Sequence, residues 1–440
     1  MIKIKSLLLS GVGVSIAVLI GRLFGFLREI LIASIFGKSY AADVATLSLM
    51  VPDTIANFLL GGAFSSAFMP ALLHSSKSKR IKLVYNIHFL LGLVFVLFTF
   101  LFYLYSEQIA FFIAEKMPID DKIKLSHLIG LSAWSIPFIV FSAILTAYLN
   151  SKHLFFFPAL GASLVNICIC VSLLMFPVLK FDAQYLMAIS IIVGSIVRWV
   201  FQFYPIFSYR AFSSACKWGS IVSNTIEIKY IKKYVHAFFA TASMVLLPIL
   251  SRYYMLQTGD GQLANLSYAQ KIADLFVTIV SGSVITVLMP RIIKNNDRFK
   301  YINYSFIVIF LFSCVISLFL NTYSETISRV LFGRGAFDNT AILSLSKHIE
   351  LISYIIPFYS SVFFLTGTLA VTDLSSKNVT STLLGLIVFI FCIYMHGQEG
   401  VKYSDVYHYI LVGYASILIM QFLFIFQHER KSNAKAYVYH

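Results

Sequence analysis

Apolar runs of about 20 residues recur from one end of the chain to the other, and each is long enough to cross roughly 30 Å of hydrocarbon as an α-helix. The polar stretches between them are too short to fold as a separate catalytic domain. We therefore predict an all-α polytopic membrane protein with twelve transmembrane helices. The predicted spans lie at residues 6–36, 40–73, 82–105, 126–149, 154–177, 184–207, 231–257, 262–293, 300–321, 348–371, 377–395 and 404–427.

The sequence also repeats itself after about 220 residues. Four short strings of the first half recur in the same order in the second half. The matched pairs are FMPALLHSSKSKR from Phe68 with LMPRIIKNNDRFK from Leu288, SEQI from Ser106 with SETI from Ser324, IPF from Ile136 with IPF from Ile356, and Leu145-Thr146 with Leu365-Thr366. Four matches at nearly one offset indicate that the two halves share one fold.

Each half of this repeat holds six predicted spans, so both halves enter the membrane from the same side. Halves repeated in this parallel way are related by a pseudo-twofold axis along the membrane normal, and a site between them can open to each side in turn by rocking. We predict an N-terminal six-helix bundle at 1–210, a cytoplasmic linker at 211–230, a C-terminal six-helix bundle at 231–428 and a cytoplasmic tail at 429–440.

Composition supports a membrane location, since 59% of the residues are hydrophobic and only 12% are charged, against roughly 25% charged in soluble domains. The net charge of +15 would suit a nucleic-acid partner, but the cations gather in alternate connections between spans. They are Lys3, Lys5, Lys77, Lys79, Arg80, Lys82, Lys152, Arg210, Lys217, Lys229, Lys232, Lys233, Arg291, Lys294, Arg298, Lys300, Lys377, Arg430, Lys431 and Lys435. By the positive-inside rule, this pattern predicts a multi-pass protein of the bacterial inner membrane, with both termini cytoplasmic and no nucleic-acid partner.

Neither a metal site nor a cofactor is expected. The five cysteines lie mostly within apolar runs, and no histidine stands near them with the spacing of a zinc site. The first apolar run is followed by charged and glycine-rich residues and not by a cleavage site, so it is interpreted as a retained span.

Ionisable side chains within membrane spans cost about 2.5 to 3.5 kcal/mol each on insertion scales, and they usually face a cavity or a partner. The first span carries Arg22, Arg28 and Glu29. Arg28 and Glu29 are candidates for a simple interfacial pair. Gly21 and Gly25 of the same span form a small-xxx-small step that favours close helix packing.

Further ionisable residues stand in later spans. Asp43 opens the second span, where a carboxylate also suits the helix dipole. Lys271 and Asp274 lie three residues apart in the eighth span, on one helical face, and are candidates for an internal ion pair. Arg198 and Arg252 are interpreted chiefly as packing or interfacial residues.

Each half thus supplies a cation where the leading spans of the two halves would meet, so the implied guest is an anion. The planar fork of arginine donates paired hydrogen bonds to phosphate, and lysine adds a point charge. We predict a transporter for an anion such as a phosphate group, with Arg22, Arg28 and Lys271 as the candidate substrate-binding residues. Glu29, Asp43 and Asp274 would tune or gate these cations.

A family resemblance adds to this interpretation. GRLFGFLREILIASIFGKSYAADV from Gly21 and VPDTIANFLLGGAFSSAFMPAL from Val51 are similar to the opening signature of the MurJ/MviN family of lipid II flippases. FFPALGASLVNI from Phe156, YAQKIADL from Tyr268 and LFGRGAFD from Leu331 follow in the order of that family. The resemblance covers nearly the whole chain and implies the MATE/MOP-like fold of the multidrug/oligosaccharidyl-lipid/polysaccharide exporter superfamily.

The resemblance also implies a mechanism. The inward-open state would take a lipid-linked glycan of the undecaprenyl-diphosphate type from the cytoplasmic leaflet, and rocking would release it outward. Arg22, Arg28 and Asp43 match charged positions of the central cavity in the family. Lys271 stands where the family usually has arginine, and Asp274 where it has glutamate. Membrane potential or an ion gradient is the expected drive, since no ATP-binding loop occurs in the sequence.

Two further expectations about partners follow, namely a functional monomer surrounded by membrane lipids and an association with the cell-wall synthesis machinery. The chain departs from the family where Ala56, Asn57 and Gly61 replace an arginine pair and a glutamate. It also ends after twelve predicted spans, whereas larger members have two more.

Three other functions fit parts of the pattern. A flippase for an O-antigen or exopolysaccharide precursor would share the whole design. A drug/cation antiporter of the same superfamily would have a cavity led by carboxylates, whereas here cations lead. A membrane glycosyltransferase would need catalytic acids on a sizeable outer loop, and the outer loops around 107–124 and 324–347 are short.

Overall fold

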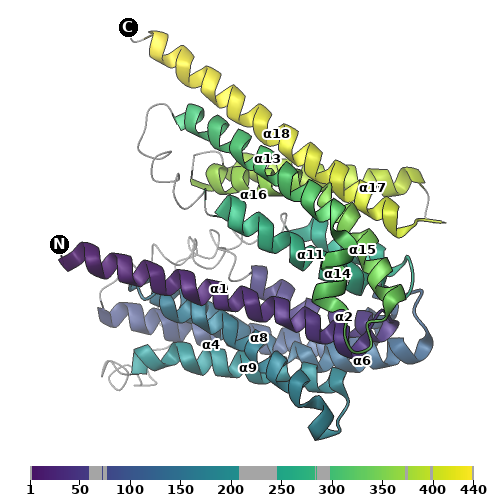
Figure 1. Cartoon of the computed structure of the whole chain (residues 1–440). Helices are drawn as coiled ribbons and strands as arrows, with labels where there is room; N and C mark the ends of the chain where they lie inside the picture. The colour runs from purple at the N-terminus through teal and green to yellow at the C-terminus, as the bar shows by residue number, and fades with distance from the viewer. Residues whose placement is uncertain are drawn as a thin grey trace. The chain divides into compact units, whose positions relative to one another are not determined.

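The computed structural model of the chain describes residues 2–58, 72, 77–207, 245–282, 284, 298–371, 375–396 and 400–438. All regular elements within these ranges are helices, as Figure 1 shows. The chain divides into two compact units, Met1–Ala242 and Ser243–His440. The predicted linker at 211–230 lies outside the described residues.

Unit 1 is built from long helices joined by short connections. They are α1 (Ile2–Phe36), α2 (Tyr40–Phe58), α4 (Lys77–Leu104), α5 (Ser106–Ile113), α6 (Ile119–Ala133), α7 (Ile136–Ser151), α8 (Phe156–Leu179) and α9 (Ala183–Phe207). Helix α8 packs between α1 and α9, α2 packs on α6, and α7 packs on both α4 and α9.

Unit 2 begins with an apolar helical segment at Val245–Leu256. The helices that follow are α11 (Gln262–Val277), which continues as the π-helical turn η3 (Thr278–Gly282), then α13 (Arg298–Thr322), α14 (Ser324–Phe332), α15 (Asn339–Ser353), α16 (Ile356–Val371), α17 (Ser375–His396) and α18 (Tyr403–Val438). The predicted cytoplasmic tail at 429–440 is helical as far as Val438.

Both units contain the same succession of elements. A long helix is followed by a short one (α4 and α5, α13 and α14), then by two helices separated by a short break (α6 and α7, α15 and α16), then by two long helices. The break falls directly before the repeated IPF string in each unit. There the N–H of Ser135 donates to the Ser132 carbonyl at 3.0 Å, and the N–H of Ile355 donates to the Ile352 carbonyl at 3.0 Å.

Proline explains this break, because it has no N–H and is best accommodated in the first turn of a helix. Pro137 and Pro357 occupy the second position of α7 and α16. In unit 2 the two parts of the span meet at an angle of 51°. The tenth predicted span is therefore two helices that meet at this angle, whereas the fourth lies within Ile119–Ser151, which forms one candidate span.

Seven helices among the described residues are long and apolar enough to cross a membrane, and the bent pair α15 and α16 makes an eighth. The other predicted spans fall on α1, α2, Val245–Leu256 and α11, and the second, seventh and eighth continue beyond the described residues. Helices α5 and α14 were not predicted. They are short and lie in segments that the sequence analysis interpreted as outer loops, where too few residues are available to show a clear period.

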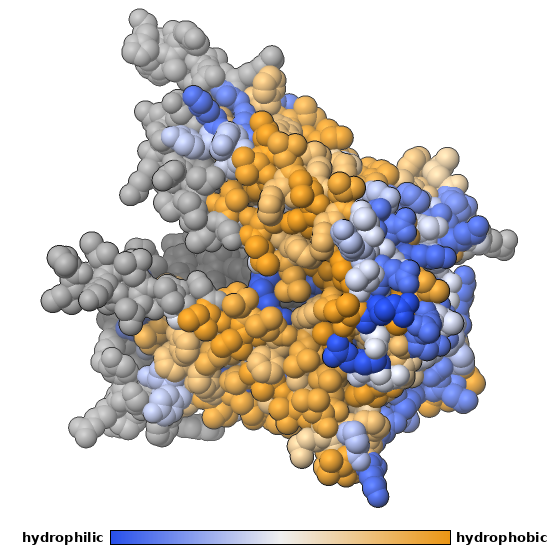
Figure 2. Space-filling model, viewed as in Figure 1, coloured by the Kyte–Doolittle hydropathy of each residue, from blue (hydrophilic) through white to orange (hydrophobic). Residues whose placement is uncertain are grey.

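The surface of each unit suits hydrocarbon. Figure 2 shows apolar side chains across the middle of the visible face and polar ones on both sides of them, most densely on one side. Helix α4 carries an exposed apolar row at four-residue spacing, formed by Phe89, Leu93, Leu97 and Leu101. In lipid such a face needs no protein partner, so helices associate instead through close packing. At Gly194 of α9, for example, an added Cβ would lie only 2.9 Å from the Cα atom of Val165 on α8.

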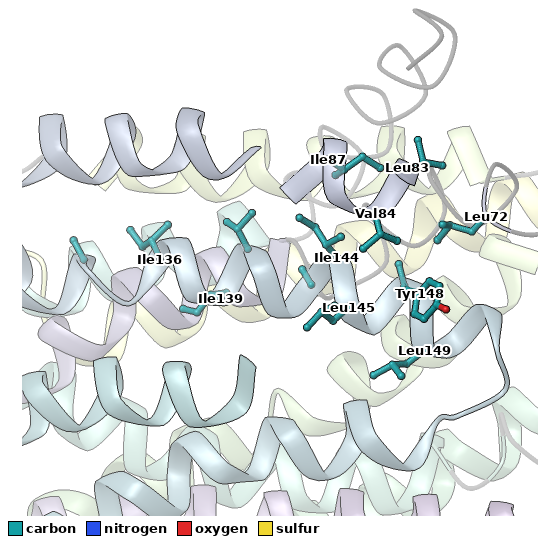
Figure 3. Close-up of a cluster of buried hydrophobic side chains, with 14 residues drawn as sticks. Leu72, Leu83, Val84, Ile87, Ile136, Ile139, Ile144, Leu145, Tyr148 and Leu149 are labelled. Carbon is teal, nitrogen blue, oxygen red and sulfur yellow. The ribbon is translucent and has the colours of Figure 1, made fainter. Parts of the chain in front are cut away.

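Helix α7 forms the core of unit 1. Its side chains are apolar nearly all round and pack against Leu72 and against the first turns of α4, as Figure 3 shows. Ile136, Val140, Ile144 and Leu149 are each no more than 1% exposed. A helix that is apolar on every face is stable only when it is surrounded, and α7 is enclosed by its neighbours in this way.

Candidate functional site

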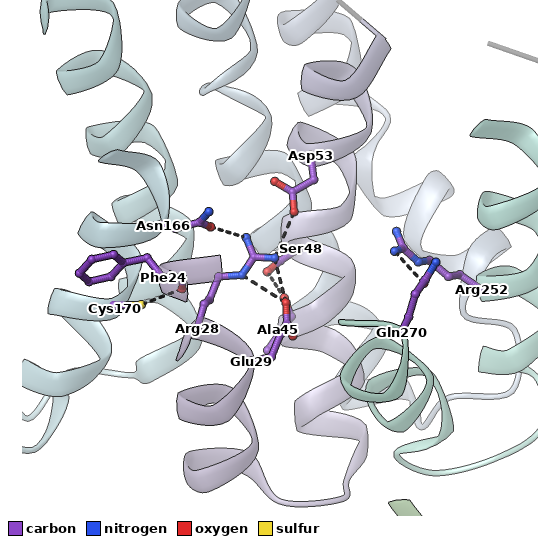
Figure 4. A network of polar contacts seen from close by, with 10 residues as sticks. All are labelled: Phe24, Arg28, Glu29, Ala45, Ser48, Asp53, Asn166, Cys170, Arg252 and Gln270. Atoms are coloured by element: carbon purple, nitrogen blue, oxygen red, sulfur yellow. Dashed lines mark hydrogen bonds and ion pairs between the residues drawn. The ribbon is translucent and has the colours of Figure 1, made fainter. Parts of the chain in front are cut away.

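Arg28 is the centre of a polar cluster within unit 1. Its Nη2 donates to Glu29 Oε1 at 2.9 Å and to Asp53 Oδ2 at 3.3 Å, while Nε donates to the same Glu29 oxygen at 3.3 Å. Its Nη1 donates to Asn166 Oδ1 at 3.1 Å. Figure 4 shows the guanidinium surrounded by these three side chains, which come from α1, α2 and α8.

Close packing of α1 on α8 allows this geometry. An added Cβ at Gly25 would lie 3.4 Å from Asn166 Nδ2, and one at Gly21 would lie 2.7 Å from Ser163 Oγ. The predicted small-xxx-small step is thus the surface of α1 that faces α8. A larger residue at Gly21 would require Ser163 of α8 to shift, whereas an added Cβ at Gly25 would be in ordinary contact with Asn166.

The charges of the cluster are unbalanced, because one guanidinium serves two carboxylates. The side chains of Arg28 and Glu29 are only 6% and 4% exposed, whereas that of Asp53 is 40% exposed. The bond from Arg28 to Asp53 is also longer than the shortest one to Glu29. Glu29 is therefore the closer and more deeply buried counter-ion of Arg28, and Asp53 is the more exposed one.

Arg22 and Asp43 lie near this cluster in the sequence. Arg22 is half-buried on α1, about 9 Å along the axis before Arg28 at 1.5 Å per residue. Asp43 is fully buried in the first turn of α2. A carboxylate in that position interacts favourably with the helix dipole, as the sequence analysis considered.

In unit 2, Asp274 of α11 accepts a hydrogen bond from the Tyr359 hydroxyl of α16 at 3.1 Å. Lys271, one turn earlier, is half-buried and forms no ion pair with Asp274. Arg252 donates from Nη2 to Gln270 Oε1 at 3.2 Å. The aspartate therefore has a neutral partner, and the ion pair considered from the sequence is not formed.

A small internal cavity of about 30 Å³ lies beside these residues in unit 2. Its polar lining comes from Ser251, Gln270 and the three tyrosines Tyr359, Tyr407 and Tyr414, and the rest is apolar. A water molecule needs roughly 10–15 Å³ of such space and at least two polar partners. The cavity therefore has room for about two waters next to the Asp274–Tyr359 bond.

The structure thus brings Arg28 and Glu29 together, and it adds residues that the sequence analysis did not select. Asp53 carried a usable signal, because a carboxylate within a span is a functional candidate by default. Asn166 and Tyr359 carried none, since a single polar residue in an apolar run fits many roles. That Arg22, Arg28 and Lys271 face one shared chamber stays a prediction.

Of the three positions that depart from the family pattern, the structure describes the side chain of one. Ala56 of α2 is half-buried and packs against the apolar cluster around α7. Gly61 and the side chain of Asn57 lie outside the described residues. Across the described ranges, no three His, Cys, Asp or Glu side chains gather in a way that could hold a metal ion.

Comparison with known proteins gives consistent matches. The family model of the lipid II flippase MurJ matches residues 32–432. A probable lipid II flippase MurJ of Buchnera aphidicola subsp. Schizaphis graminum is 26% identical over 362 residues, which cover 79% of this chain and 70% of the relative. The lipid II flippase MurJ of Thermosipho africanus is 24% identical over 410 residues, covering 91% and 82%.

Solved structures show the same fold. A lipid II flippase MurJ in an inward closed conformation superposes with a TM-score of 0.83 at 21% identity, covering 94% of this chain and 87% of the other. An inward-facing MATE family multidrug transporter of the MOP superfamily superposes with a TM-score of 0.77 at 12% identity, covering 94% and 96%. The predicted MATE/MOP-like all-α membrane fold is confirmed.

Proposed function

Because the chain belongs to the lipid II flippase MurJ family, we propose that it moves lipid II across the bacterial inner membrane and that Arg28 binds the diphosphate. It acts as a transporter for the peptidoglycan precursor and not as an enzyme. The curated relatives named above are lipid II flippases or probable ones, which favours this substrate over an O-antigen or exopolysaccharide precursor. The likeness to MATE transporters concerns the fold alone.

The buried Arg28 cluster is the observation that supports this assignment. A diphosphate cannot enter hydrocarbon with its water shell, so the transporter has to replace hydration with fixed donors. Glu29 and Asn166 hold the guanidinium through Nε, Nη1 and Nη2. A phosphate oxygen takes the place of the exposed Asp53 carboxylate on Nη2, since charge-assisted bonds from arginine to phosphate are among the strong ones in proteins.

The other charged residues complete the proposed path. Arg22 extends the positive surface of α1 by about one and a half turns, and Lys271 supplies a cation in unit 2. Asp43 and Asp274 tune these cations, the latter through its bond to Tyr359. Rocking of the two six-helix halves exposes the site alternately to each side of the membrane.

The proposal includes the setting in which transport occurs. Both termini lie in the cytoplasm, according to the distribution of Lys and Arg in the connections. Membrane potential or an ion gradient drives the cycle without a cofactor. The functional protein is a monomer that works beside the cell-wall synthesis machinery.

Complementation tests the function directly. The chain is expressed in cells depleted of their own lipid II flippase, and growth is scored together with the amount of protein in the membrane fraction. We expect the natural sequence to restore growth and Arg28→Ala and Arg22→Ala to fail at equal protein levels. Arg329→Ala is the matched control, because Arg329 is an exposed arginine paired with Glu325 on α14.

The outcomes separate the substrate from the site. Growth restored equally by Arg28→Ala, Arg22→Ala and the natural sequence would refute the assigned residues while supporting the function. No growth with any version, despite normal insertion, would refute lipid II as the substrate. Lipid II exposed on the outer leaflet, measured with an externally added enzyme that cleaves it, gives a second readout independent of growth.

A further inference from the structure

A second polar cluster lies on α9, away from the Arg28 cluster. Ser195, Arg198, Trp199 and Gln202 follow the spacing i, i+3, i+4 and i+7, which places them on one helical face. Each carries a buried polar atom without a hydrogen-bond partner, namely Ser195 Oγ, Arg198 Nε, Trp199 Nε1 and Gln202 Oε1. Since buried polar atoms in proteins nearly always have partners, such a concentration calls for an explanation.

Helix α7 adds a further unpaired group to this face. Gln202 Nε2 donates to Thr146 Oγ1 of α7 at 3.3 Å, which fixes the level at which the two helices meet. The chain reverses direction between α7 and α8 and again between α8 and α9, so α7 and α9 run parallel. Ser142 lies one turn before Thr146, and Arg198 lies one turn before Gln202. Ser142 is therefore level with Arg198. The Ser142 hydroxyl is fully buried and also lacks a partner.

Helix α8 closes the cluster from the other side. An added Cβ at Gly161 would lie 2.9 Å from Gln202 Nε2 and 3.5 Å from Arg198 Cγ, so both side chains lie over this glycine. Gly161 and Asn166 point in directions roughly 140° apart around α8, at 3.6 residues per turn. The α9 cluster is therefore separate from the Arg28 cluster, to which Asn166 belongs.

Within the part of the chain that the structure describes, the charge of Arg198 has no counter-ion. Its side chain is 5% exposed, and among the described residues it takes part in no hydrogen bond or ion pair. Helices α7, α8 and α9 contain no Asp or Glu at all. Burying an isolated charge is strongly unfavourable, and Arg28, with its two carboxylates and an amide, has the partners that a buried arginine normally requires.

The repeat indicates that this charge is not needed for folding. In unit 2, Gln421 Nε2 donates to Thr366 Oγ1 at 3.0 Å and to Asn378 Oδ1 at 2.8 Å, which reproduces the Gln202–Thr146 bond. The positions that correspond to Arg198 fall at Ile417 and Leu418. The glutamine–threonine bond is thus common to both units, whereas the arginine belongs to unit 1 alone.

The chemistry of the unpaired atoms identifies the ligand class. Four of them are hydrogen-bond donors, from Ser142, Ser195, Arg198 and Trp199, and one of these is cationic. We propose that these four residues form an enclosed site for a small inorganic anion such as chloride. A monovalent anion here would neutralise the charge of Arg198 and accept hydrogen bonds from the donors that have no protein partner. The near-complete burial of the site favours a compact ion over a lipid headgroup.

Thermal unfolding of the purified full chain tests the site, with sodium chloride replaced by sodium gluconate at constant ionic strength. Gluconate is too large for an enclosed site. We expect the Tm to be higher in chloride by roughly 3 °C or more, since a ligand that binds only the folded state stabilises it. Arg198→Met should lose this difference, and Arg329→Met, the exposed control, should keep it.

Ser195→Ala provides a second variant if Arg198→Met does not fold. It removes one donor and little volume, so the chloride concentration for half of the effect should rise several-fold. Equal Tm values in chloride and gluconate for the natural sequence would overturn the proposal. So would an unchanged chloride effect in Arg198→Met, or stabilisation by phosphatidylglycerol vesicles but not by chloride.

Discussion

The two units share a helical framework but differ in the polar groups that it encloses. Each has a span with a break before an Ile-Pro-Phe string and a part-buried glutamine–threonine bond between its fourth and sixth spans. Unit 1 encloses two arginines, one with carboxylate partners and one without, whereas the corresponding interior of unit 2 holds a neutral amide cluster and an aspartate bonded to a tyrosine. The two units thus share the helical framework but differ in the charged side chains that it encloses, and these side chains give the two units different roles.

The largest expected effect concerns the charged cluster of unit 1. Arg28→Ala leaves Glu29 buried without its counter-ion, which should lower the free energy of unfolding by about 3–5 kcal/mol. The double variant Arg28→Ala with Glu29→Gln removes the uncompensated charge and should recover much of that stability. Thermal unfolding in detergent measures both.

Transport separates the two roles of this arginine. The double variant should remain unable to restore growth, because the phosphate ligand is still absent. Growth at the natural level would show that Arg28 serves only to balance Glu29. Asp274→Asn in unit 2, which keeps an acceptor for Tyr359, should change stability far less than Arg28→Ala does.

The shared framework is probed by Gln421→Leu and Gln202→Leu. Interhelical hydrogen bonds in membranes contribute on average about 0.6 kcal/mol and at most about 1.7 kcal/mol. Gln421 donates to two partners and Gln202 to one, so the loss in unit 2 should be the larger of the two. A greater loss from Gln202→Leu, measured as the shift in Tm, would mean that unit 1 relies on this bond more than its geometry suggests.

Asp53→Asn tests whether the exposed carboxylate competes with the substrate. The amide keeps the shape of the side chain but removes its charge, so a diphosphate lipid should bind up to about fivefold more tightly. This factor corresponds to the free energy that a half-exposed ion pair contributes. Binding of lipid II to the purified protein measures the effect. Weaker binding would instead make Asp53 a direct ligand of the substrate or of a coupling cation.

The smallest effect is expected at the connection between α8 and α9 of unit 1. Asp182 accepts from Lys124 Nζ at 2.7 Å and from the backbone N–H groups of Gln184 and Tyr185 at the start of α9. Partial burial alone would raise the pKa of Asp182, but the bond to Lys124 and its charge, with the two N–H groups, lower it below the usual value. Protonation therefore costs more in the folded protein than in the unfolded one.

This contribution to stability is present above the unfolded-state pKa near 3.9 and is lost as the pH falls through the lower folded-state value. Since both side chains are more than a third exposed, it amounts to a few tenths of a kcal/mol. Asp182→Asn keeps the helix cap and removes the charge. Its Tm should be slightly below that of the natural sequence at pH 6, and the difference should vanish once the pH lies well below the folded-state pKa of Asp182. A difference that stays constant with pH would assign the effect to capping.

Several features of the candidate site could be predicted from the sequence because they depend on single residues in a known setting. A charge within an apolar run is visible without any partner, so Arg28, Glu29 and Asp274 could be selected as candidates from the sequence. The structure places them buried or half-buried, and their roles stay predictions. Their partners were not predictable. Asp53 and Asn166 lie 25 and 138 residues from Arg28, and Tyr359 lies 85 residues from Asp274.

The sequence by itself determined the membrane setting, the order of the spans and the internal repeat. These depend on the length of apolar runs and on matches at a fixed offset, which need no knowledge of packing. Only the tertiary structure decided which charges are paired. Packing of α1 on α8 through Gly21 and Gly25 brings Asn166 to Arg28, while α7 and α8 surround Arg198 with no carboxylate at all. Periodicity within one helix cannot specify such contacts, because they depend on which faces of different helices meet.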